Sequence, residues 1–353
     1  MRKKERKKKI ITIIRIVIIT LIIFIITDYI FKLIHKKYNS GTDYVIPNQI
    51  FHHTLEKNLI INNFFQYKKY QIITNSLGFR DSKIREIIKI TKNRRIVFIG
   101  DSFTEGVGLD YEKTFVGIID NVFSKKNIEV LNAAVQSYSP KIYYRKIKYL
   151  IEIEKVLFTD LVVFIDISDI EDEAIYYDVD KNNNVISIKN ESLKFSFGHI
   201  KRIIQDNFFF TFKVLSFFKQ TIFPTSAYDR YKSFKRARLD NTYSNYGFKE
   251  SINYMNKLYD LCKENNINLT IAVYPWPTQI YEEDLESKQV KVWYKWSKSK
   301  NVKLINYFPK FIKKNSSEFE RKLIIKKYYF ENDVHFNMHG NELISNYFFI
   351  EFK

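Results

Sequence analysis

Apolar residues run almost without interruption near the start of the chain and recur later only in short runs. The segment Ile10–Thr27 contains one charged residue, Arg15, and its apolar character extends to residue 34. A helix rises about 1.5 Å per residue, so a segment of this length can cross the hydrocarbon core of a bilayer. We therefore predict a transmembrane helix over residues 10–34, preceded by a tail over residues 1–9.

Charged residues on either side of this helix predict its orientation. The tail, MRKKERKKK, has seven basic residues and one acid, whereas fewer basic residues follow the helix closely. Because basic flanks are retained in the cytoplasm, we expect the N-terminus there and the rest of the chain in the periplasm or outside the cell. The alternative is a cleaved signal peptide, but no A-x-A-like site follows and the apolar run is longer than usual.

Beyond residue 90, five short apolar runs alternate with segments of helical periodicity such as Lys141–Glu154. This alternation predicts an α/β domain over residues 91–353, with a parallel sheet covered on both faces. The gap between the third and fourth runs is too long for a simple crossover, so we expect an insertion at about residues 174–245. Residues 35–90 are expected to form a stalk and approach segment. The five runs are Ile96–Ile99, Ile128–Leu131, Leu161–Ile165, Leu269–Val273 and Val302–Ile305.

Composition narrows the possible functions. With 31 Phe and 25 Tyr among 353 residues, the chain is too aromatic to be disordered, and its single cysteine, Cys262, excludes a disulfide framework and a cysteine-rich metal site. The 58 basic and 39 acidic residues give a net charge of +19, which raises the question of nucleic-acid binding. No nucleic-acid-binding motif is present, and the tail, with seven basic residues less one acid, accounts for +6. The remaining +13 (19 less 6) fits an anionic glycan or membrane surface, and we expect no nucleic-acid partner.

The stretch RIVFIGDSFTEGVGL (Arg95–Leu109) contains the first catalytic candidate. A strand that runs into Gly-Asp-Ser places Ser102 at the carboxyl end of a parallel strand, where open α/β sheets build their sites. Serine needs a neighbouring base to act as a nucleophile, and a tight strand–helix turn offers backbone N–H groups to an oxyanion. The alternative is a plain helix cap, because Asp and Ser both favour cap positions.

Elimination among the six histidines points to the base. Near the C-terminus, Asp333 and His335 are two residues apart, so the carboxylate can accept from one imidazole nitrogen while the other faces a serine. His339 is a rival base and could also pair with His335 as a metal ligand. Only Asp333 is an obvious third ligand, and Gly340 is unfavourable inside a helix, so we expect no metal site. The other histidines lie in the stalk or the insertion: His35, His52, His53 and His199.

Three sequence blocks then carry a family resemblance. The first block is Gly100–Phe103 (GDSF), the last is Asp333–His335 in the form Asp-x-His, and Thr74–Asp81 (TNSLGFRD) resembles a lead-in that precedes the first block. From about residue 75 onward the chain is similar to the SGNH (GDSL-type) hydrolases of bacteria. The resemblance implies a flavodoxin-like three-layer α/β/α fold with a parallel five-stranded sheet, and no metal or organic cofactor.

The resemblance also assigns roles: Ser102 as nucleophile, His335 as general base and then acid, and Asp333 as the group that orients His335. It implies an oxyanion hole formed by the N–H of Ser102 together with a glycine N–H and an Asn amide. Ser137 and Ser168 stand at the last two places. The N–H of Ser137 survives if its backbone fits, whereas the Ser168 hydroxyl is short and must rotate to donate. Loss of one donor costs on the order of 10²–10³ in rate, so Ser168 predicts weakened catalysis or an acceptor other than water.

Three further features carry less weight. Asp169 and Asp172 are interpreted as ordinary loop carboxylates. The motif Tyr274–Pro277 (YPWP), with two tryptophans downstream, could offer aromatic platforms to a sugar, but rim packing is favoured. The apolar stretch Asp206–Phe218 could be an interfacial helix, an acyl-chain pocket or a lid, and buried packing of the insertion is favoured over all three.

The sequence therefore predicts an outward-facing, membrane-anchored ester hydrolase, with O-acyl groups of envelope glycans as the favoured substrate class. One alternative is an O-acyltransferase that modifies an extracellular polysaccharide with a membrane acyltransferase as partner. The other is a catalytically weakened carbohydrate-binding scaffold. Ser168 motivates this second alternative, whereas the complete set Ser102, Asp333 and His335 argues against it.

Overall fold

The computed structural model describes residues 2–35, 44–65, 68–188, 208, 210–211, 214–215, 217–218 and 242–352. The chain forms two compact units. The first comprises Met1–Ser40 and Lys189–Thr225, and the second comprises Gly41–Ile188 and Ser226–Lys353. Most of the insertion expected at about residues 174–245, including His199, lies outside the described residues.

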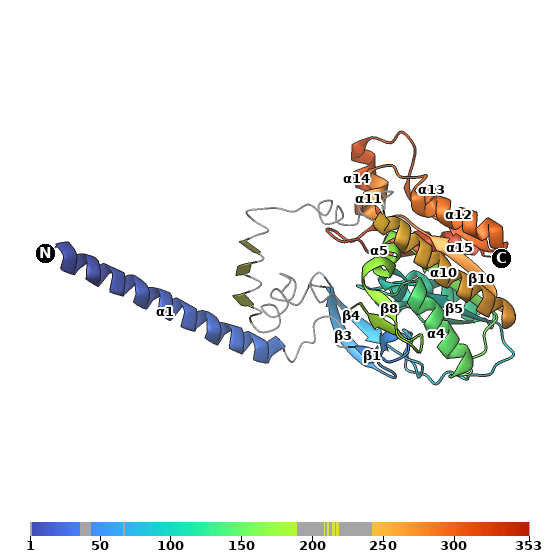
Figure 1. Ribbon diagram of the computed structural model, residues 1–353, viewed down its shortest axis with the longest axis horizontal. Coiled ribbons are helices and arrows are strands. Elements are labelled where there is room, and N and C mark those ends of the chain that lie inside the picture. Colours follow the sequence, from blue (N-terminus) through green and yellow to red (C-terminus); the bar gives the residue numbers. More distant parts are fainter. Residues whose placement is uncertain are drawn as a thin grey trace. The chain divides into compact units, whose positions relative to one another are not determined.

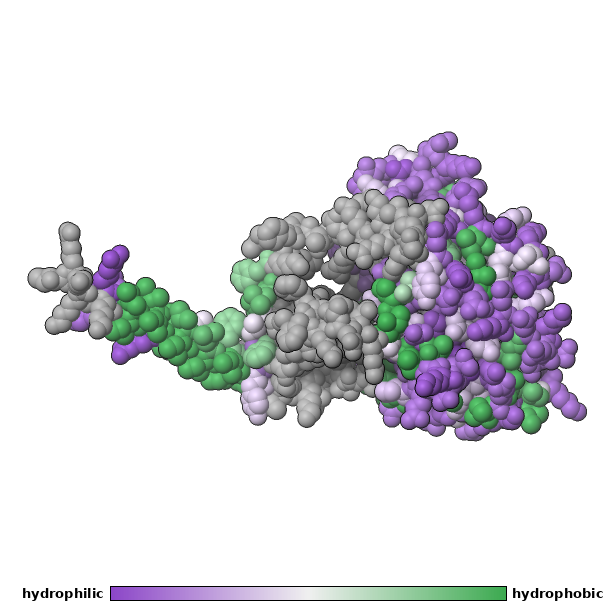
Figure 2. Space-filling model, in the orientation of Figure 1, coloured by the Kyte–Doolittle hydropathy of each residue, from purple (hydrophilic) through white to green (hydrophobic). Residues whose placement is uncertain are grey.

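The first unit contains one long helix, α1 (Arg2–His35). Within the described ranges, Lys8–Phe31 is the one helical stretch long and apolar enough to cross a membrane, with a mean hydropathy of 3.0. Its apolar side chains are exposed and form a continuous surface (Figure 2). The hydroxyls of three threonines each donate to the backbone carbonyl four residues earlier, so these hydroxyls need no water as a hydrogen-bond partner. The three are Thr12, Thr20 and Thr27. These features suit the predicted membrane helix, and a signal sequence would share them.

Part of the stretch Asp206–Phe218 packs against α1. The backbone N–H and the hydroxyl of Thr211 donate to the Asp28 carboxylate at 2.9 and 2.5 Å, and the Phe210 ring lies 5.9 Å from the Phe24 ring. Other apolar side chains of the stretch are exposed: Phe208, Leu215, Phe217 and Phe218. The described part of the stretch therefore buries only some of its side chains, rather than packing fully as the sequence led us to expect.

The second unit begins with two antiparallel hairpins. β1 (Val45–Asn48) pairs with β2 (His52–Leu55), and β3 (Ile60–Phe65) pairs with β4 (Lys68–Ile73). Residues 44–73 thus fold with the domain, where the sequence indicated a stalk and approach segment. Polar residues interrupt the alternation of apolar and polar positions in these strands, so the sequence pattern does not predict them. The side chains that join the hairpins to the domain core are Tyr44, Phe51, Leu55, Tyr70 and Ile72.

Five parallel strands form the central sheet, in the spatial order β11-β10-β7-β5-β6. Numbered along the chain and taken from the β6 edge, this order is 2-1-3-4-5, which is the flavodoxin-like arrangement. The predicted fold class is therefore confirmed, and each of the five apolar runs falls on a strand. The strands are β5 (Arg95–Ile99), β6 (Glu129–Asn132), β7 (Asp160–Ile165), β10 (Asn268–Val273) and β11 (Lys303–Asn306).

Helices cover both faces of this sheet (Figure 1). α4 (Pro140–Glu152) packs beside α10 (Thr242–Glu264), and α3 (Phe115–Ser124) packs against α15 (Met338–Glu351) on the opposite face, as right-handed crossovers require. The remaining described elements are α2 (Ser102–Glu105), the 3₁₀ turn Tyr111–Lys113, α5 (Ile167–Ile175), β8 (Tyr177–Val179), β9 (Val185–Ser187), α11 (Pro277–Tyr281), α12 (Lys288–Lys300), α13 (Phe308–Phe311) and α14 (Glu318–Tyr328).

The aromatic motif that follows β10 belongs to the core. Tyr274 and Trp276 are buried, and so are both downstream tryptophans, Trp293 and Trp296. Packing, the favoured interpretation, therefore holds, and these rings do not form a platform for a sugar because solvent does not reach their faces.

Candidate active site

A tight turn after β5 positions the candidate nucleophile. The Asp101 carboxylate caps α2 by accepting from the Phe103 N–H at 3.0 Å. A side chain at Gly100 would meet Thr104 Oγ1 at 2.2 Å, so glycine is needed where the chain turns this closely. The turn leaves Ser102 partly exposed at the start of α2, at the carboxyl end of the strand, where the sequence placed it.

A chain of hydrogen bonds joins the three residues predicted to act together. His335 Nε2 lies 2.8 Å from Ser102 Oγ, and His335 Nδ1 lies 2.5 Å from Asp333 Oδ1. With Nδ1 protonated toward the carboxylate, Nε2 is free to accept the Ser102 proton. This is the arrangement in which a serine becomes a nucleophile and a carboxylate fixes the tautomer of its base.

The loop between α14 and α15 holds His335, the candidate base, in place. Asp333 Oδ1 also accepts the backbone N–H of His335 at 2.9 Å, and the Phe330 N–H donates to the His335 carbonyl at 3.0 Å. Burial raises the pKa of Asp333, but hydrogen bonds and charge from His335 lower it by more, so the net shift is downward. The carboxylate therefore stays ionised beside the imidazole.

The alternative uses of the C-terminal histidines do not fit the geometry. His339 is exposed, and its Nδ1 lies 3.2 Å from Glu342 Oε2. Both ring nitrogens of His335 are engaged by Ser102 and Asp333, so neither is available to share a metal ion with His339.

Two histidines assigned to the stalk lie instead on β2, beside the loop that carries Ser137. His53 Nε2 is 2.8 Å from the Gln136 carbonyl oxygen, and the Nδ1 atoms of His52 and His53 are 2.8 Å apart. Burial lowers the pKa of His53 to about 4, so this ring is neutral at pH 7 and a poor base. It supports the loop by hydrogen bonding.

The loop after β6 places a backbone donor where the resemblance calls for a glycine. Ser137 has φ of 60°, in the left-handed region that favours glycine. The Tyr177 hydroxyl donates to the Ser137 carbonyl at 2.7 Å and holds this conformation. Within the described part of the chain, the N–H groups of Ser102 and Ser137 have no hydrogen-bond acceptor. Both are therefore available to a substrate oxyanion.

The third expected oxyanion donor is already engaged. The Ser168 hydroxyl donates to Asp166 Oδ1 at 2.6 Å, and the Ser168 N–H donates to the same atom at 2.7 Å. To reach an oxyanion, the hydroxyl would have to give up a charge-assisted hydrogen bond. The structure thus supports the expectation that Ser168 is a weak oxyanion donor, because its hydroxyl would first have to break this bond.

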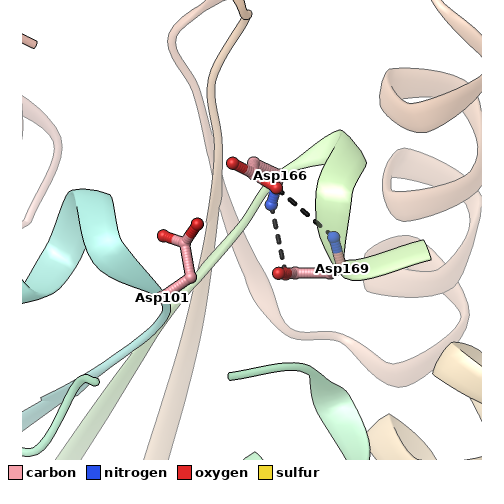
Figure 3. A group of neighbouring side chains, drawn as sticks. All are labelled: Asp101, Asp166 and Asp169. Carbon is pink, nitrogen blue, oxygen red and sulfur yellow. Dashed lines mark hydrogen bonds between the residues drawn. The ribbon is translucent and has the colours of Figure 1, made fainter. Parts of the chain in front are cut away.

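Three carboxyl groups converge at the carboxyl ends of β5 and β7: Asp101, Asp166 and Asp169 (Figure 3). Their ligand-capable atoms lie within 4.8 Å of one another, and all three residues are buried. Burial, followed by repulsion from Asp166, raises the pKa of Asp101 and of Asp169 well above the ordinary value, so the cluster favours a partly protonated state. Aromatic donors satisfy part of it: the Trp276 Nε1–H donates to Asp166 at 2.6 Å, and the Tyr143 hydroxyl donates to Asp169 Oδ2 at 3.0 Å. Among the described residues, Asp169 Oδ1 has no hydrogen-bond partner.

The expected loop carboxylates are helical instead. Asp169 is the third residue of α5, where its carboxylate accepts the Asp166 N–H in a capping box, and Asp172 lies one turn further along. Both are buried. The interpretation of Asp169 and Asp172 as ordinary loop groups was wrong. The short polar residues of a capping box resemble those of a loop in sequence, so the start of this helix is easily mistaken for a loop.

Two residues that brace the site have no assigned role in the sequence. Glu105 is buried and accepts the Gln136 N–H at 2.7 Å and the Tyr44 hydroxyl at 2.9 Å, so it ties α2 to the loop before Ser137. The buried Arg80 guanidinium donates to the carbonyls of Glu105, Gly106 and Leu109 and so satisfies the end of α2. Arg80 belongs to the TNSLGFRD lead-in, and this motif was the one feature of the sequence that could have drawn attention to it.

Several solved structures are similar to this chain. Esterase EstA from Pseudoalteromonas sp. has 10% identity and a TM-score of 0.36, covering 74% of this chain and 97% of its own. The acetylxylan esterase Axe2 from Geobacillus stearothermophilus has 11% identity and a TM-score of 0.42, covering 75% and 96%. A GDSL-like lipase from Bacteroides thetaiotaomicron has 11% identity and a TM-score of 0.39, covering 75% and 90%.

No family model matches the sequence, and no curated protein matches it. The strand order of the sheet and the positions of the sequence blocks instead identify the fold. The GDSF block follows the first strand of the 2-1-3-4-5 sheet, and the Asp-x-His block precedes the last helix. On these grounds the chain has the fold of the SGNH (GDSL-type) hydrolases.

Proposed function

We propose that the protein is a serine ester hydrolase of the SGNH type. The observation that carries this proposal is the continuous chain from Ser102 Oγ through His335 to Asp333, with distances of 2.8 and 2.5 Å. Ser102 Oγ attacks the ester carbonyl while His335 Nε2 takes its proton, and Asp333 stabilises the resulting imidazolium. The N–H groups of Ser102 and Ser137 stabilise the oxyanion. His335 then protonates the leaving alcohol, and water attacks the acyl-enzyme to release the acid.

The proposed location is the cell membrane. The helix Lys8–Phe31 acts as a single-pass anchor, and the basic tail keeps the N-terminus in the cytoplasm. The second unit then faces the periplasm or the exterior, where O-acylated envelope glycans are the accessible esters. We therefore favour O-acyl groups on such glycans as substrates.

An O-acyltransferase that modifies an extracellular polysaccharide is the second candidate, with a membrane acyltransferase as partner. The engaged hydroxyl of Ser168 favours it, because an enzyme with a weakened oxyanion hole benefits from a bound acceptor rather than water. The same contact supports a third candidate, a carbohydrate-binding scaffold with little activity.

Hydrolysis of 4-nitrophenyl acetate by the full-length protein in detergent micelles tests these candidates. We expect Ser102→Ala to lower the rate by roughly 10³-fold or more, because it removes the nucleophile. Ser124→Ala, which changes an exposed serine on α3, is the matched control and should retain the parent rate. Equal rates in Ser102→Ala and the parent would contradict esterase function and favour the binding scaffold. Acetyl transfer to an added oligosaccharide that outpaces hydrolysis would identify the O-acyltransferase.

A further inference from the structure

A cleft of about 1170 Å³ lies beside the proposed active site, within the second unit. Its lining residues come from β4, residues 108–113, α11, α14 with the loop that follows it, and the start of α15. The loop that carries Asp333 and His335 lines the cleft through Phe330 and Asn332. The cleft therefore extends to the loop that supplies the proposed base.

The Phe65 ring packs against both His335 and a residue that lines the cleft, Phe330. The ring centroid of Phe65, at the end of β3, lies 5.8 Å from that of His335 and 5.0 Å from that of Phe330. A side chain at Gly108 would meet Phe65 at 2.8 Å and Phe330 at 3.0 Å, so the glycine allows both rings to approach. A polymer bound in the cleft would thus lie next to the site where its ester groups must react.

The lining of the cleft is basic. Five lysines and two acidic residues give it a net charge of +3. Lys113 is paired with Asp110 at 2.7 Å, and Lys322 is paired with a glutamate on its own helix at 2.6 Å. The other three lysines are exposed and, in the part of the chain that the structure describes, have no carboxylate within ion-pair distance: Lys68, Lys69 and Lys326. Unpaired positive charge therefore lies on two of the elements that line the cleft, β4 and α14.

We propose that this cleft binds an anionic segment of the glycan, bearing carboxylate or phosphate groups, while a neighbouring ester reacts at Ser102. This inference rests on the proposed ester hydrolysis. Unpaired cations on two lining elements, β4 and α14, attract and retain a polyanion. The partly buried rings of Tyr281 and Phe330 add apolar surface of the kind that sugar rings contact. The cleft is too large for a small acyl group alone, and its concave shape suits a chain better than a flat membrane.

Binding to defined polymers tests the proposal without requiring turnover. The full-length Ser102→Ala protein in micelles is titrated with polygalacturonate, long-chain polyphosphate and neutral arabinoxylan at 20 and 300 mM NaCl. We expect at least one polyanion to bind at least tenfold more tightly than arabinoxylan at low salt and to weaken at high salt, because salt screens exposed charges. The two polyanions distinguish carboxylate from phosphate recognition.

Charge-reversal variants locate the site. Lys68→Glu, Lys69→Glu and Lys326→Glu, combined, should weaken polyanion binding at least tenfold. The control combines Lys125→Glu, Lys126→Glu and Lys263→Glu, which change three exposed lysines near the amino ends of β6 and β10. The control has the same net charge as the cleft variant and should retain binding within about twofold. Equal losses in both variants, or polyanion binding no tighter than arabinoxylan binding, would overturn the proposal.

A catalytic comparison separates this proposal from the proposed function. With Ser102 restored, the cleft variant should keep the parent rate on 4-nitrophenyl acetate but lose kcat/KM on O-acetylated polygalacturonate at least tenfold. If the parent protein hydrolyses neither ester, the ester-hydrolase proposal fails while the binding measurements still decide the role of the cleft. If the cleft variant retains its kcat/KM on the acetylated polyanion, the cleft proposal fails while the hydrolase proposal stands.

Discussion

At the scale of single residues, the backbone of Ser137 is held in the left-handed region at the point where the proposed oxyanion hole needs an N–H donor. Its φ of 60° costs an L-residue with a side chain on the order of 1–2 kcal/mol, and a β-branched residue more. The hydroxyl is not required for the donor, since the N–H belongs to the backbone. Side-chain identity at this position therefore matters through conformation.

We predict opposite outcomes for two substitutions at Ser137. Ser137→Gly should keep kcat/KM on 4-nitrophenyl acetate within about twofold and leave Tm unchanged or slightly raised, because glycine adopts this φ without strain. Ser137→Val should lower kcat at least tenfold, because a β-branched residue would move the loop and its N–H. Equal activity of the two variants would show that the Ser137 N–H takes no part in catalysis.

The residues of the site differ in how far the sequence reveals them. Ser102, Asp333 and His335 could be identified because each lies in a short block with a recognisable spacing. Glu105 and Arg80 could not, because their role depends on contacts with residues at least 25 positions away along the chain. Ser168 was recognised as a departure, but only the structure shows its hydroxyl on Asp166.

At the scale of elements, the strands of the sheet were predictable and the hairpins were not. β5 and β7 are buried on both faces and read as unbroken apolar runs, which makes them visible. β2 and β3 contain His and Asn residues whose partners come from other elements, such as Gln136 for His53 and Tyr70 for Asn63. Tertiary contacts, rather than local pattern, stabilise these short strands.

The contact between the first hairpin and α4 depends on a buried lysine. Lys146 Nζ donates to the Tyr138 hydroxyl at 3.1 Å and lies over the rings of Phe51 and Phe79. Burial lowers its pKa to about 7, and the charge of Glu105 opposes this only in part. Between that value and its ordinary pKa of 10.5, the unfolded chain binds a proton that the folded chain does not. Stability should therefore rise with pH in this window, by at most about 1.4 kcal/mol per pH unit.

Lys146→Met should remove this pH dependence. We expect the Tm of the parent protein to rise between pH 7 and pH 9 relative to that of the variant, because methionine fills a similar volume without a titrating group. The matched control is Lys148→Met on the same helix, where the lysine is partly exposed and faces Glu152. This control variant should keep the same dependence of Tm on pH as the parent protein. A parent Tm that falls or stays level relative to Lys146→Met would contradict a neutral buried Lys146.

At the scale of the whole molecule, the net charge of +19 lies on two parts of the chain, for which we propose different roles. The tail contributes +6 next to the predicted membrane helix, and the remaining +13 lies on the rest of the chain. In the second unit, part of that charge lies in the lysine-lined cleft. The first portion is proposed to set orientation, and the cleft portion is proposed to bind an anionic chain. The two roles predict separate phenotypes.

Orientation can be measured with a C-terminal alkaline phosphatase fusion, which is active only outside the cytoplasm. We expect the parent fusion to be active, because the basic tail holds the N-terminus inside. Replacing the five lysines of the tail with glutamine removes most of the charge bias across the helix, and should lower fusion activity severalfold as chains insert in both orientations. The cleft variant at Lys68, Lys69 and Lys326 is the control, since these lysines lie far from the helix in the sequence.

The opposite result would be an inactive parent fusion together with a fluorescent C-terminal green fluorescent protein fusion. It would place the second unit in the cytoplasm and would contradict the proposal that envelope glycans are the substrates. Release of the active fusion into the soluble fraction would identify residues 10–34 as a cleaved signal sequence instead of an anchor. That result would preserve the outward location, since export through a signal sequence and insertion as an anchor deliver the domain to the same side. The proposed ester chemistry would survive it, because Ser102, His335 and Asp333 all belong to the second unit.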